Sequence, residues 1–241
     1  MASGLAFING VLGRFLFREG QVARVREVSA RFRLVELVGE ALRDIEWSAG
    51  DKVQVYLPDV GLMRTYTPLM WDRQLGATRF LVYLHGDGPG ARWGRTVKVG
   101  DRCRFFGPRG TLALESLSGP VVLFGDETSF AVAHTLRALR PDARSAEFVF
   151  EVSSPQESTA VLAELGLGEA FVVARRDSDA HLPELEARLR EALGRQPRAH
   201  LVMTGRAQAI QSLRGRLRSG DAVVAGQKVK AYWSLGKAGL D

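Results

Sequence analysis

Cysteine is almost absent from this chain of 241 residues, and Cys103 is the single one. One cysteine cannot form an internal disulfide, and it cannot supply a cysteine-based zinc site or the ligands of an iron–sulfur cluster. Cys103 alternates with arginines and shares its side with Phe105, which indicates a core position. Only four histidines are present, and neither they nor the carboxylates have the spacing of a metal site. We therefore expect no resident metal.

Long apolar runs are also missing. The apolar stretch in residues 1–20 lacks a basic start and is interrupted by polar residues and glycines, namely Asn9, Gly10, Gly13 and Arg14. It is too short to span a bilayer and does not resemble a targeting segment. We expect an N-terminal amphipathic helix over 1–20, no membrane insertion and a cytoplasmic protein.

Runs of like charge are absent as well, although the net charge is +6. Residues 1–119 hold 17 basic and 12 acidic side chains, whereas residues 120–241 hold 16 and 15. A nucleic-acid-binding protein typically gathers its basic residues into a stripe with interleaved aromatic residues, so we expect no nucleic-acid partner. A modest, dispersed excess favours a site for an anionic small molecule.

The first half of the chain shows the alternation of short β-strands. Turn residues separate segments in which apolar and polar side chains alternate, and such even spacing is typical of a closed antiparallel barrel. We predict a Greek-key β-barrel domain over residues 21–115. The segments are 21–28, 32–38, 51–58, 77–86 and 101–108.

After residue 117 the pattern changes to strands alternating with helices. "PVVLFG" (120–125) is entirely apolar, as expected of a strand buried on both faces of a parallel sheet. Leu185, Leu189 and Leu193 mark one face of a helix, and similar spacings recur around residues 132–139 and 210–217. This alternation predicts an α/β domain with a parallel sheet over 120–241, ending in a basic tail.

The stretch "MRTYTP" (63–68) carries the first candidate binding residues. A guanidinium at Arg64 can hold phosphate bidentately, and the ring of Tyr66 can stack on an aromatic ligand. Thr67 offers a hydroxyl and a backbone N–H to the edge of that ligand. These groups suit a flavin, and the alternative is a polar edge strand.

A glycine-rich stretch, "LHGDGPGARWG" (84–94), follows one hairpin later. Gly86, Gly88 and Gly90 permit close backbone approach, and their N–H groups could form an anion-binding concavity. The alternative is a plain hairpin turn. The spacing would place this stretch and "MRTYTP" on neighbouring strands.

Five motifs in order resemble those of the siderophore-interacting protein family: "RTYTP", "YLHGDGPGARW", "GDRCRFFGPRG", "LFGDETSFA" and "YWSLGK". This family comprises FAD-dependent ferric-siderophore reductases with the architecture of ferredoxin reductases. The resemblance implies FAD as cofactor, NADH or NADPH as hydride donor and a ferric siderophore as electron acceptor. It implies FAD contacts from Arg64, Thr65, Tyr66, Thr67, His85 and Gly86, with Gly90, Ala91, Arg92 and Trp93 near the phosphates.

The turn in "LFGDETSFAVA" (123–133) is the expected nicotinamide side. A strand ends at Gly125 and a helix begins at once, so its first N–H groups could face a phosphate. This is not the dinucleotide fingerprint G-x-G-x-x-G, and Asp126 could simply cap the helix. We expect nucleotide contact chiefly from Gly125 and Thr128.

Three departures from the family pattern concern the acceptor and the nicotinamide nucleotide. Leu69 stands where the family usually has a basic residue, Arg206 stands where it has glutamate, and "YWSLGK" replaces "YWRRG". Arg206 could pair with an NADPH 2′-phosphate or an anionic siderophore, or be a surface arginine. Lysines and aromatic residues could attract an anionic iron chelate, although a solvated tail is equally compatible. The candidate substrate-binding residues are Lys52, Arg206, Lys228, Lys230, Tyr232, Trp233 and Lys237.

We therefore expect a flavoprotein reductase in which NAD(P)H delivers hydride to the flavin between the two domains. No nucleophile–base arrangement is visible, so we expect no acid–base catalyst, with Thr67 near flavin N5. Two alternatives stay open. One is an NAD(P)H–flavin reductase that passes electrons to a haem or iron–sulfur protein, and the other is a non-catalytic binder of ferric chelates.

Overall fold

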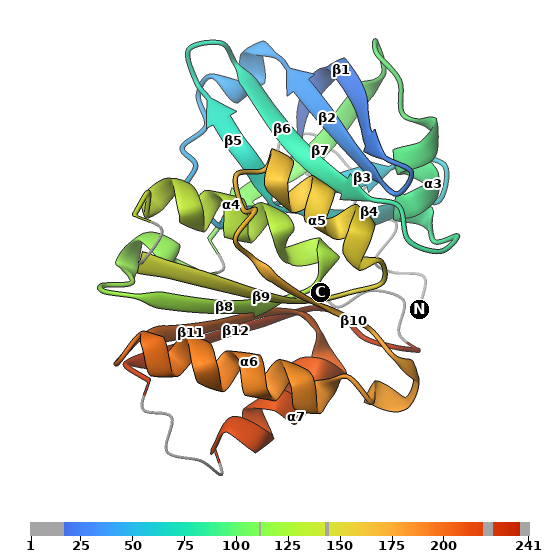
Figure 1. The fold of residues 1–241 in the computed structure, drawn as a ribbon. Helices are drawn as coiled ribbons and strands as arrows, with labels where there is room; N and C mark the ends of the chain where they lie inside the picture. Colours follow the sequence, from blue (N-terminus) through green and yellow to red (C-terminus); the bar gives the residue numbers. More distant parts are fainter. Residues whose placement is uncertain (1–16, 111, 143–144, 219–223, 237–241) are drawn as a thin grey trace, which may run out of the picture. The chain divides into compact units, whose positions relative to one another are not determined.

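Two compact units make up the computed structural model, which describes residues 17–110, 112–142, 145–218 and 224–236 (Figure 1). The second unit begins at Leu112, slightly before the 115–120 boundary expected from the sequence. The N-terminal helix expected over 1–20 falls mostly outside the described residues, but Arg18–Gly20 belong to a strand because they pair with Cys103–Phe105. No helix among the described residues is both long and apolar enough to cross a membrane.

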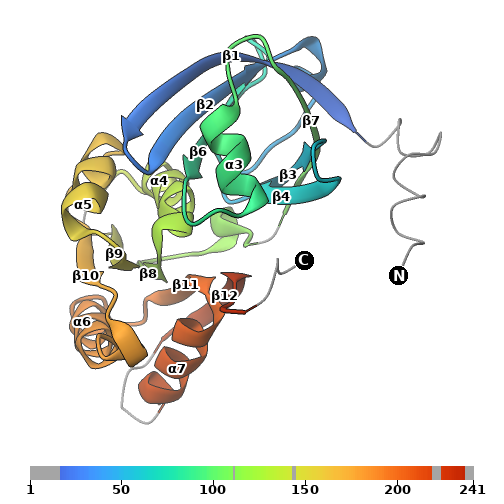
Figure 2. The same cartoon turned by 90° about the vertical axis from the view of Figure 1, so that its right-hand side faces the viewer.

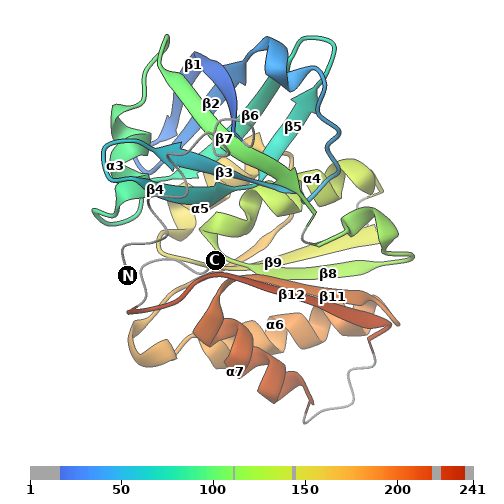
Figure 3. The ribbon, with the colours of Figure 1, turned by 180° about the vertical axis from the view of Figure 1, so that it is seen from behind.

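The first unit is an antiparallel sheet of seven strands in the order β4-β3-β7-β1-β2-β6-β5. Figure 3 shows β3 between β4 and β7. This arrangement confirms the predicted antiparallel barrel. The elements are β1 (Arg18–Ser29), β2 (Phe32–Val38), the 3-10 helix η1 (Glu40–Leu42), β3 (Lys52–Leu57), β4 (Leu62–Tyr66), β5 (Pro68–Asp72), β6 (Ala77–Tyr83), α3 (Pro89–Thr96) and β7 (Arg102–Arg109).

The link between β4 and β5 shows that this sheet curls. The two strands stand at opposite ends of the strand order, yet Thr67 alone separates them in the chain. One residue spans less than 4 Å, so the two ends of the sheet must meet. The rings of Tyr66 on β4 and Phe80 on β6 lie 6.1 Å apart, which closes the barrel around a buried apolar core.

Helix α3 packs against the barrel strand β6 (Figure 2). Its Gly94 allows the close approach: a Cβ there would lie 2.5 Å from Leu84 Cδ2 and 2.7 Å from Val82 Cγ1. Pro89 occupies the first turn, where a missing N–H costs nothing. The glycine-rich stretch is therefore a turn that leads into a helix rather than part of a hairpin.

The second unit is a five-stranded parallel sheet in the order β10-β9-β8-β11-β12, as the strand–helix alternation predicted. Helices α4 and α5 lie on one face of the sheet and α6 and α7 on the other (Figure 1). The elements are η2 (Leu114–Ser116), β8 (Val121–Gly125), η3 (Glu127–Ser129), α4 (Phe130–Leu139), β9 (Ala146–Val152), α5 (Pro155–Glu164), β10 (Phe171–Ala174), η5 (Asp177–Asp179), α6 (Leu182–Arg195), β11 (His200–Arg206), α7 (Ala207–Arg218) and β12 (Gly226–Trp233).

The order of the parallel strands indicates where a ligand would bind the second unit. From the central strand β8 the chain adds β9 and β10 on one side and then returns to add β11 and β12 on the other. The connections therefore diverge between β8 and β11. In open α/β sheets, ligands bind outside the carboxyl ends of the strands at such a switch point.

Candidate functional site

In the first unit, the two sequence motifs meet at a cradle formed by Arg64, Tyr66 and Gly90, which we call the β4–α3 cradle. A Cβ at Gly90 would lie 3.3 Å from Arg64 Cγ and 3.4 Å from Tyr66 Oη. Because glycine has no side chain, the start of α3 can lie directly against β4 at this position. The motifs are thus neighbours through α3 and β4, not through two paired strands.

The first turn of α3 adds hydrogen-bond donors to this cradle. The first intrahelical bond of α3 runs from Arg92 N to Gly88 O, so the N–H groups of Gly90 and Ala91 precede the intrahelical ladder. Such N–H groups and the helix dipole favour an anion. The Arg64 side chain, whose Cγ lies near Gly90 and whose Nη1 donates to Met63 O at 2.7 Å, adds a positive charge, so the group fits a ligand that carries phosphate.

Tyr66 is half-buried against aromatic neighbours. Its ring centroid lies 6.1 Å from Phe80 and 5.6 Å from Trp93, both in tilted geometry. Burial raises the pKa of Tyr66 well above its ordinary value, only partly opposed by Arg64. The phenol stays neutral at physiological pH and its ring is held in place, as stacking on a planar ligand requires.

Several of the other residues predicted around the flavin are exposed. His85 stacks on Tyr83 with ring centroids 5.3 Å apart, and Gly86 O accepts a bond from Arg95. Arg92 is exposed and donates to Asp87 O. Of the other predicted contacts, Thr65 is exposed, Thr67 is half-buried between β4 and β5, and Trp93 packs against the barrel core. Leu69, which departs from the family pattern, is buried.

At the carboxyl edge of the second unit, Gly125 ends β8 and Asp126 caps the 3-10 helix η3. Asp126 Oδ1 accepts from Thr128 N at 2.8 Å, and Asp126 N donates to Ser129 Oγ in a capping box. A Cβ at Gly125 would lie 2.4 Å from Ser129 Cβ, so only glycine fits. The structure therefore assigns Asp126 the capping role that the sequence left as an alternative.

Asp126 also contacts the ends of two other strands. Trp233 Nε1 donates to Asp126 Oδ2 at 2.7 Å, and a Cβ at Gly205 would lie 2.5 Å from the same oxygen. Burial raises the pKa of Asp126 to about 6, and the neighbouring charge of Glu127 adds to the increase. Near neutral pH this carboxyl group is thus close to its titration midpoint.

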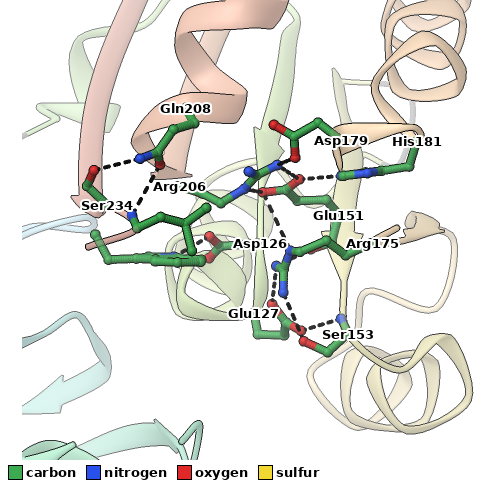
Figure 4. Close-up of polar contacts among 12 residues, drawn as sticks. Asp126, Glu127, Glu151, Ser153, Arg175, Asp179, His181, Arg206, Gln208 and Ser234 are labelled. Carbon is green, nitrogen blue, oxygen red and sulfur yellow. Dashed lines mark hydrogen bonds and ion pairs between the residues drawn. The ribbon is translucent and has the colours of Figure 1, made fainter. Parts of the chain in front are cut away.

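Arg206 differs most from its expected role. Only 2% of it is exposed, and Nε and Nη2 donate to the two oxygens of Glu151 at 2.7 and 2.8 Å (Figure 4). Nη2 also lies 2.7 Å from Asp179 Oδ1. Burial lowers the pKa of Arg206, but bonds to Glu151 and Asp179 outweigh it and raise the pKa above its ordinary value. Arg206 is thus neither a surface arginine nor a guanidinium turned toward a ligand.

Glu151 is the centre of this arrangement. It is fully buried and accepts from His181 Nε2 at 2.7 Å in addition to Arg206. His181 Nδ1 accepts from Arg176 N, which fixes the tautomer with the proton on Nε2. The loop that carries Asp179 and His181 is thereby fastened to the sheet, although Ser178 and Asp179 have left-handed φ values of 52° and 59°.

A second ion pair joins the turn after β8 to the end of β10. Arg175 Nη2 donates to Glu127 Oε2 at 3.0 Å, and Glu127 Oε1 accepts from Ser153 N. Burial alone would raise the pKa of Glu127, but Arg175 and the Ser153 N–H outweigh it and lower the pKa. Arg175 also lies 5.7 Å from the centroid of the Trp233 ring. The strand-end network comprises Asp126, Glu127, Glu151, Arg175, Asp179, His181 and Arg206.

The other candidate substrate contacts are distributed over both units. Lys52 lies in β3 of the first unit. Lys228 and Lys230 share one face of β12, and Lys228 Nζ lies 3.3 Å from Ser116 Oγ. Tyr232 and Trp233 lie where the register between β11 and β12 shifts, opposite Arg206. Lys237 lies outside the described residues.

Sequence reasoning missed most of the strand-end network. Glu151 follows three apolar residues in the strand segment "AEFVFEV", which also contains Glu147, and that was the available signal, because a buried carboxylate needs a buried cationic partner. Its partner Arg206 lies 55 residues away, which spacing alone does not reveal. In the ranges that the structure describes, no group of three or more histidine, cysteine or acidic residues could hold a metal ion.

Two family models match the chain in succession. Residues 59–112 match the siderophore-interacting FAD-binding domain, and residues 119–236 match the siderophore-interacting protein model. The β4–α3 cradle falls within the first match and the strand-end network within the second. No curated protein matched the chain.

Solved structures share the fold over 90–93% of the chain. A siderophore utilization protein from T. fusca is 25% identical with a TM-score of 0.71, covering 93% of this chain and 95% of that one. The siderophore-interacting protein SipS from Aeromonas hydrophila is 22% identical with a TM-score of 0.70, covering 92% and 93%. The ferredoxin reductase in carbazole 1,9a-dioxygenase is 16% identical with a TM-score of 0.70, covering 90% and 69%. The last two likenesses concern the fold alone.

Proposed function

Because this chain belongs to the siderophore-interacting protein family, we propose that it is an FAD-dependent NAD(P)H oxidoreductase that reduces Fe(III) in a ferric siderophore. Membership supports the broader class, a flavoprotein oxidoreductase. In the proposed reaction, one NAD(P)H and two Fe(III) chelates yield NAD(P)⁺, one proton and two Fe(II). Fe(II) binds hard oxygen ligands more weakly than Fe(III), so the metal is released. A supply of NAD(P)H points to the cytoplasm.

The β4–α3 cradle carries the FAD part of the proposal. The guanidinium of Arg64, the free N–H groups at the start of α3 and the half-buried ring of Tyr66 fit the phosphates and the planar ring of FAD. Bound FAD would supply the conversion of hydride transfer into single-electron transfer. Arg64 neutralises phosphate charge, Tyr66 provides a stacking surface, and Thr67 donates a hydrogen bond near the ring edge.

Contacts to the other two ligands complete the proposal. Gly125 and Thr128, at the carboxyl end of β8, approach the nicotinamide nucleotide, because this is the switch point of the sheet. Lys228, Lys230 and Tyr232 attract an anionic chelate, with Lys52 and Lys237 as further candidates. We no longer propose Arg206 as a ligand contact. We assign it the role of a positioning residue that holds the strand-end network together.

The decisive experiment reconstitutes the purified protein with FAD and measures anaerobic oxidation of NADH and NADPH with ferric chelates. We expect flavin absorbance and oxidation that depends on the chelate. Bound FAD without reduction of any chelate, but with reduction of a haem or iron–sulfur protein, would favour a reductase with a protein partner. Chelate binding without any FAD binding would favour a non-catalytic binder.

Arg64→Ala tests the cradle directly. Removing one charge-assisted phosphate contact should weaken FAD binding by about 10- to 100-fold, since such bonds contribute about 1.5–3 kcal/mol. Quenching of flavin fluorescence on titration measures the affinity. Arg102→Ala, an exposed arginine on β7 whose side chain is 81% accessible, is the matched control and should leave it unchanged. Equal FAD affinity in both variants would remove Arg64 from the proposed site.

A further inference from the structure

We propose that the carboxyl edge of the second unit selects NADH over NADPH. The inference rests on the proposed function, because it assumes that a nicotinamide nucleotide binds at the switch point between β8 and β11. It concerns which nucleotide is accepted there, and it depends on the ion pairs of the strand-end network rather than on the flavin.

An NADPH site needs a cation that is available for the 2′-phosphate, whereas an NADH site needs a carboxylate for the ribose hydroxyls. Three arginines lie at the carboxyl ends of β10 and β11, namely Arg175, Arg176 and Arg206. Which nucleotide fits therefore depends on whether these guanidiniums already have anionic partners.

Arg175 is hydrogen-bonded to the carboxylate of Glu127 and lies near that of Glu151. Its Nη2 donates to Glu127, its Nε lies 3.9 Å from Glu151 Oε1, and its Nη1 donates to Ser153 Oγ. Glu127 is only 3% exposed, and its pKa is lowered, so it stays ionised at neutral pH. A phosphate that took the Nη2 donor of Arg175 would displace a buried carboxylate that has little access to water.

Arg206 is engaged even more completely, by the two oxygens of Glu151 and by Asp179. Arg176 is the exposed member of the three, and its Nη2 donates to Glu184 at 2.9 Å. That pair is accessible to water and weak, so Arg176 is the most available of the three guanidiniums.

The balance of charge points the same way. The strand-end network contains the carboxyl groups of Asp126, Glu127, Glu151 and Asp179 against the guanidiniums of Arg175 and Arg206 (Figure 4). A 2′-phosphate, which carries nearly two negative charges at neutral pH, is repelled by this excess. The uncharged ribose diol of NADH can instead donate to a carboxylate.

The test uses ADP-ribose and 2′-phospho-ADP-ribose, because these probes are redox-inert and report binding without any turnover. Isothermal titration calorimetry on the FAD-loaded full chain gives both affinities. We expect ADP-ribose to bind at least about 10-fold more tightly, and kcat/KM to favour NADH over NADPH by a similar factor with ferricyanide as acceptor.

Glu127→Gln tests the cause of the selection. It keeps the shape of the side chain but removes the charge that holds Arg175, so affinity for 2′-phospho-ADP-ribose should rise about 10-fold while that for ADP-ribose stays within about threefold. Glu147→Gln is the control. It breaks a similar pair, with Arg195, near the amino end of β9 and should change neither affinity.

Each outcome bears on the inference. If the wild-type protein binds 2′-phospho-ADP-ribose as tightly as ADP-ribose or more tightly, the inference is wrong and the proposed function stands. Loss of 2′-phospho-ADP-ribose binding in Arg176→Ala would then identify Arg176 as the phosphate contact. Binding of neither probe overturns the inference together with the nicotinamide part of the proposed function. Because the wild-type comparison stands alone, a Glu127→Gln variant that does not fold leaves the test intact.

Discussion

The pair of Arg206 and Glu151 places a full positive and a full negative charge among buried side chains at the end of β9 and β11. Arg206 is 2% exposed and Glu151 is fully buried. Breaking such a pair by removing one partner is costly, because the other charge then stays buried without compensation. Replacing both partners by apolar residues of similar size reduces that cost, although His181 Nε2 then loses its acceptor and Asp179 its cation.

Arg206→Met should therefore lower the free energy of unfolding by about 3–5 kcal/mol. The double variant Glu151→Leu with Arg206→Met should recover part of this loss. Urea denaturation of the three proteins measures both effects. If Arg206→Met instead leaves stability unchanged and weakens chelate binding, Arg206 is a ligand contact rather than a positioning residue.

The carboxyl group of Asp126 makes stability depend on pH in the opposite direction from most acidic residues. Its pKa in the folded protein is about 6, above the ordinary value near 4, so the folded state favours the protonated form. The resulting stabilisation is fully present below about pH 4 and is lost as the pH rises through about 6.

Asp126→Asn removes this dependence. The free energy of unfolding of the variant relative to wild type should increase by about 3 kcal/mol between pH 4 and pH 8, since each pKa unit corresponds to about 1.4 kcal/mol. Chemical denaturation at several pH values measures the difference. Asp44→Asn, at an exposed position, should show no comparable trend. If the difference between Asp126→Asn and wild type does not change with pH, folding does not raise the pKa of Asp126.

Among the elements, α3 depends on small residues where it contacts β6. The contact distances at Gly94 leave no room for a methyl group, because Val82 and Leu84 lie within 2.7 Å of the position that a Cβ would take. Arg64 and Tyr66 contact the start of the same helix at Gly90. A shift of α3 away from β6 would therefore also disturb the β4–α3 cradle.

Gly94→Ala should cost about 1–3 kcal/mol of stability through overpacking and should weaken FAD binding at the same time. Gly215→Ala in α7 is the matched control, because nothing lies within 4 Å of its Cβ position. That variant should stabilise the protein by about 0.5–1 kcal/mol, as alanine is the better helix former. Thermal unfolding and flavin titration provide the two measurements. Equal effects of the two substitutions would contradict the packing of α3 on β6.

Helix α3 also shows what could not be predicted from the sequence. "PGARWGRT" contains one proline and two glycines among eight residues, so its helix propensity is low and its packing against the barrel stabilises it as a helix. The long helices α6 and α7 were predictable because their leucines repeat on one face. Most antiparallel strands followed from the alternation of apolar and polar side chains, and the parallel strands followed from apolar runs between helices, although β5 was not predicted. The ion pairs of Arg206, by contrast, depend on folding that joins distant strands.

At the scale of the whole molecule, the candidate residues divide between two separate units. The β4–α3 cradle lies in the first and the strand-end network in the second. The order of motifs in the sequence was sufficient to predict this division. It was not sufficient to predict which charged side chains are available to bind a ligand, because this depends on ion-pair partners from other elements.

Hydrogen exchange should therefore respond to each ligand in a different unit. FAD should slow exchange of amides in β4 and the first turn of α3, whereas ADP-ribose should slow exchange around residues 125–128, because a bound ligand stabilises the segments that it contacts against local opening. Mass spectrometry of peptides from the free and liganded protein locates the protection. Protection by FAD confined to the second unit would contradict the assignment.

The position of the first strand in each sheet has a consequence for synthesis on the ribosome. In the barrel, β1 pairs with β7, as between Gly20 and Cys103, so this seam cannot form until β7 has emerged. In the parallel sheet, β8 emerges first and lies at the centre, so later strands can add outward from it. A nascent chain that pauses before β7 exposes the unpaired edges of β1 and β3 to other chains, whereas a pause after β9 leaves a growing sheet that later strands can extend.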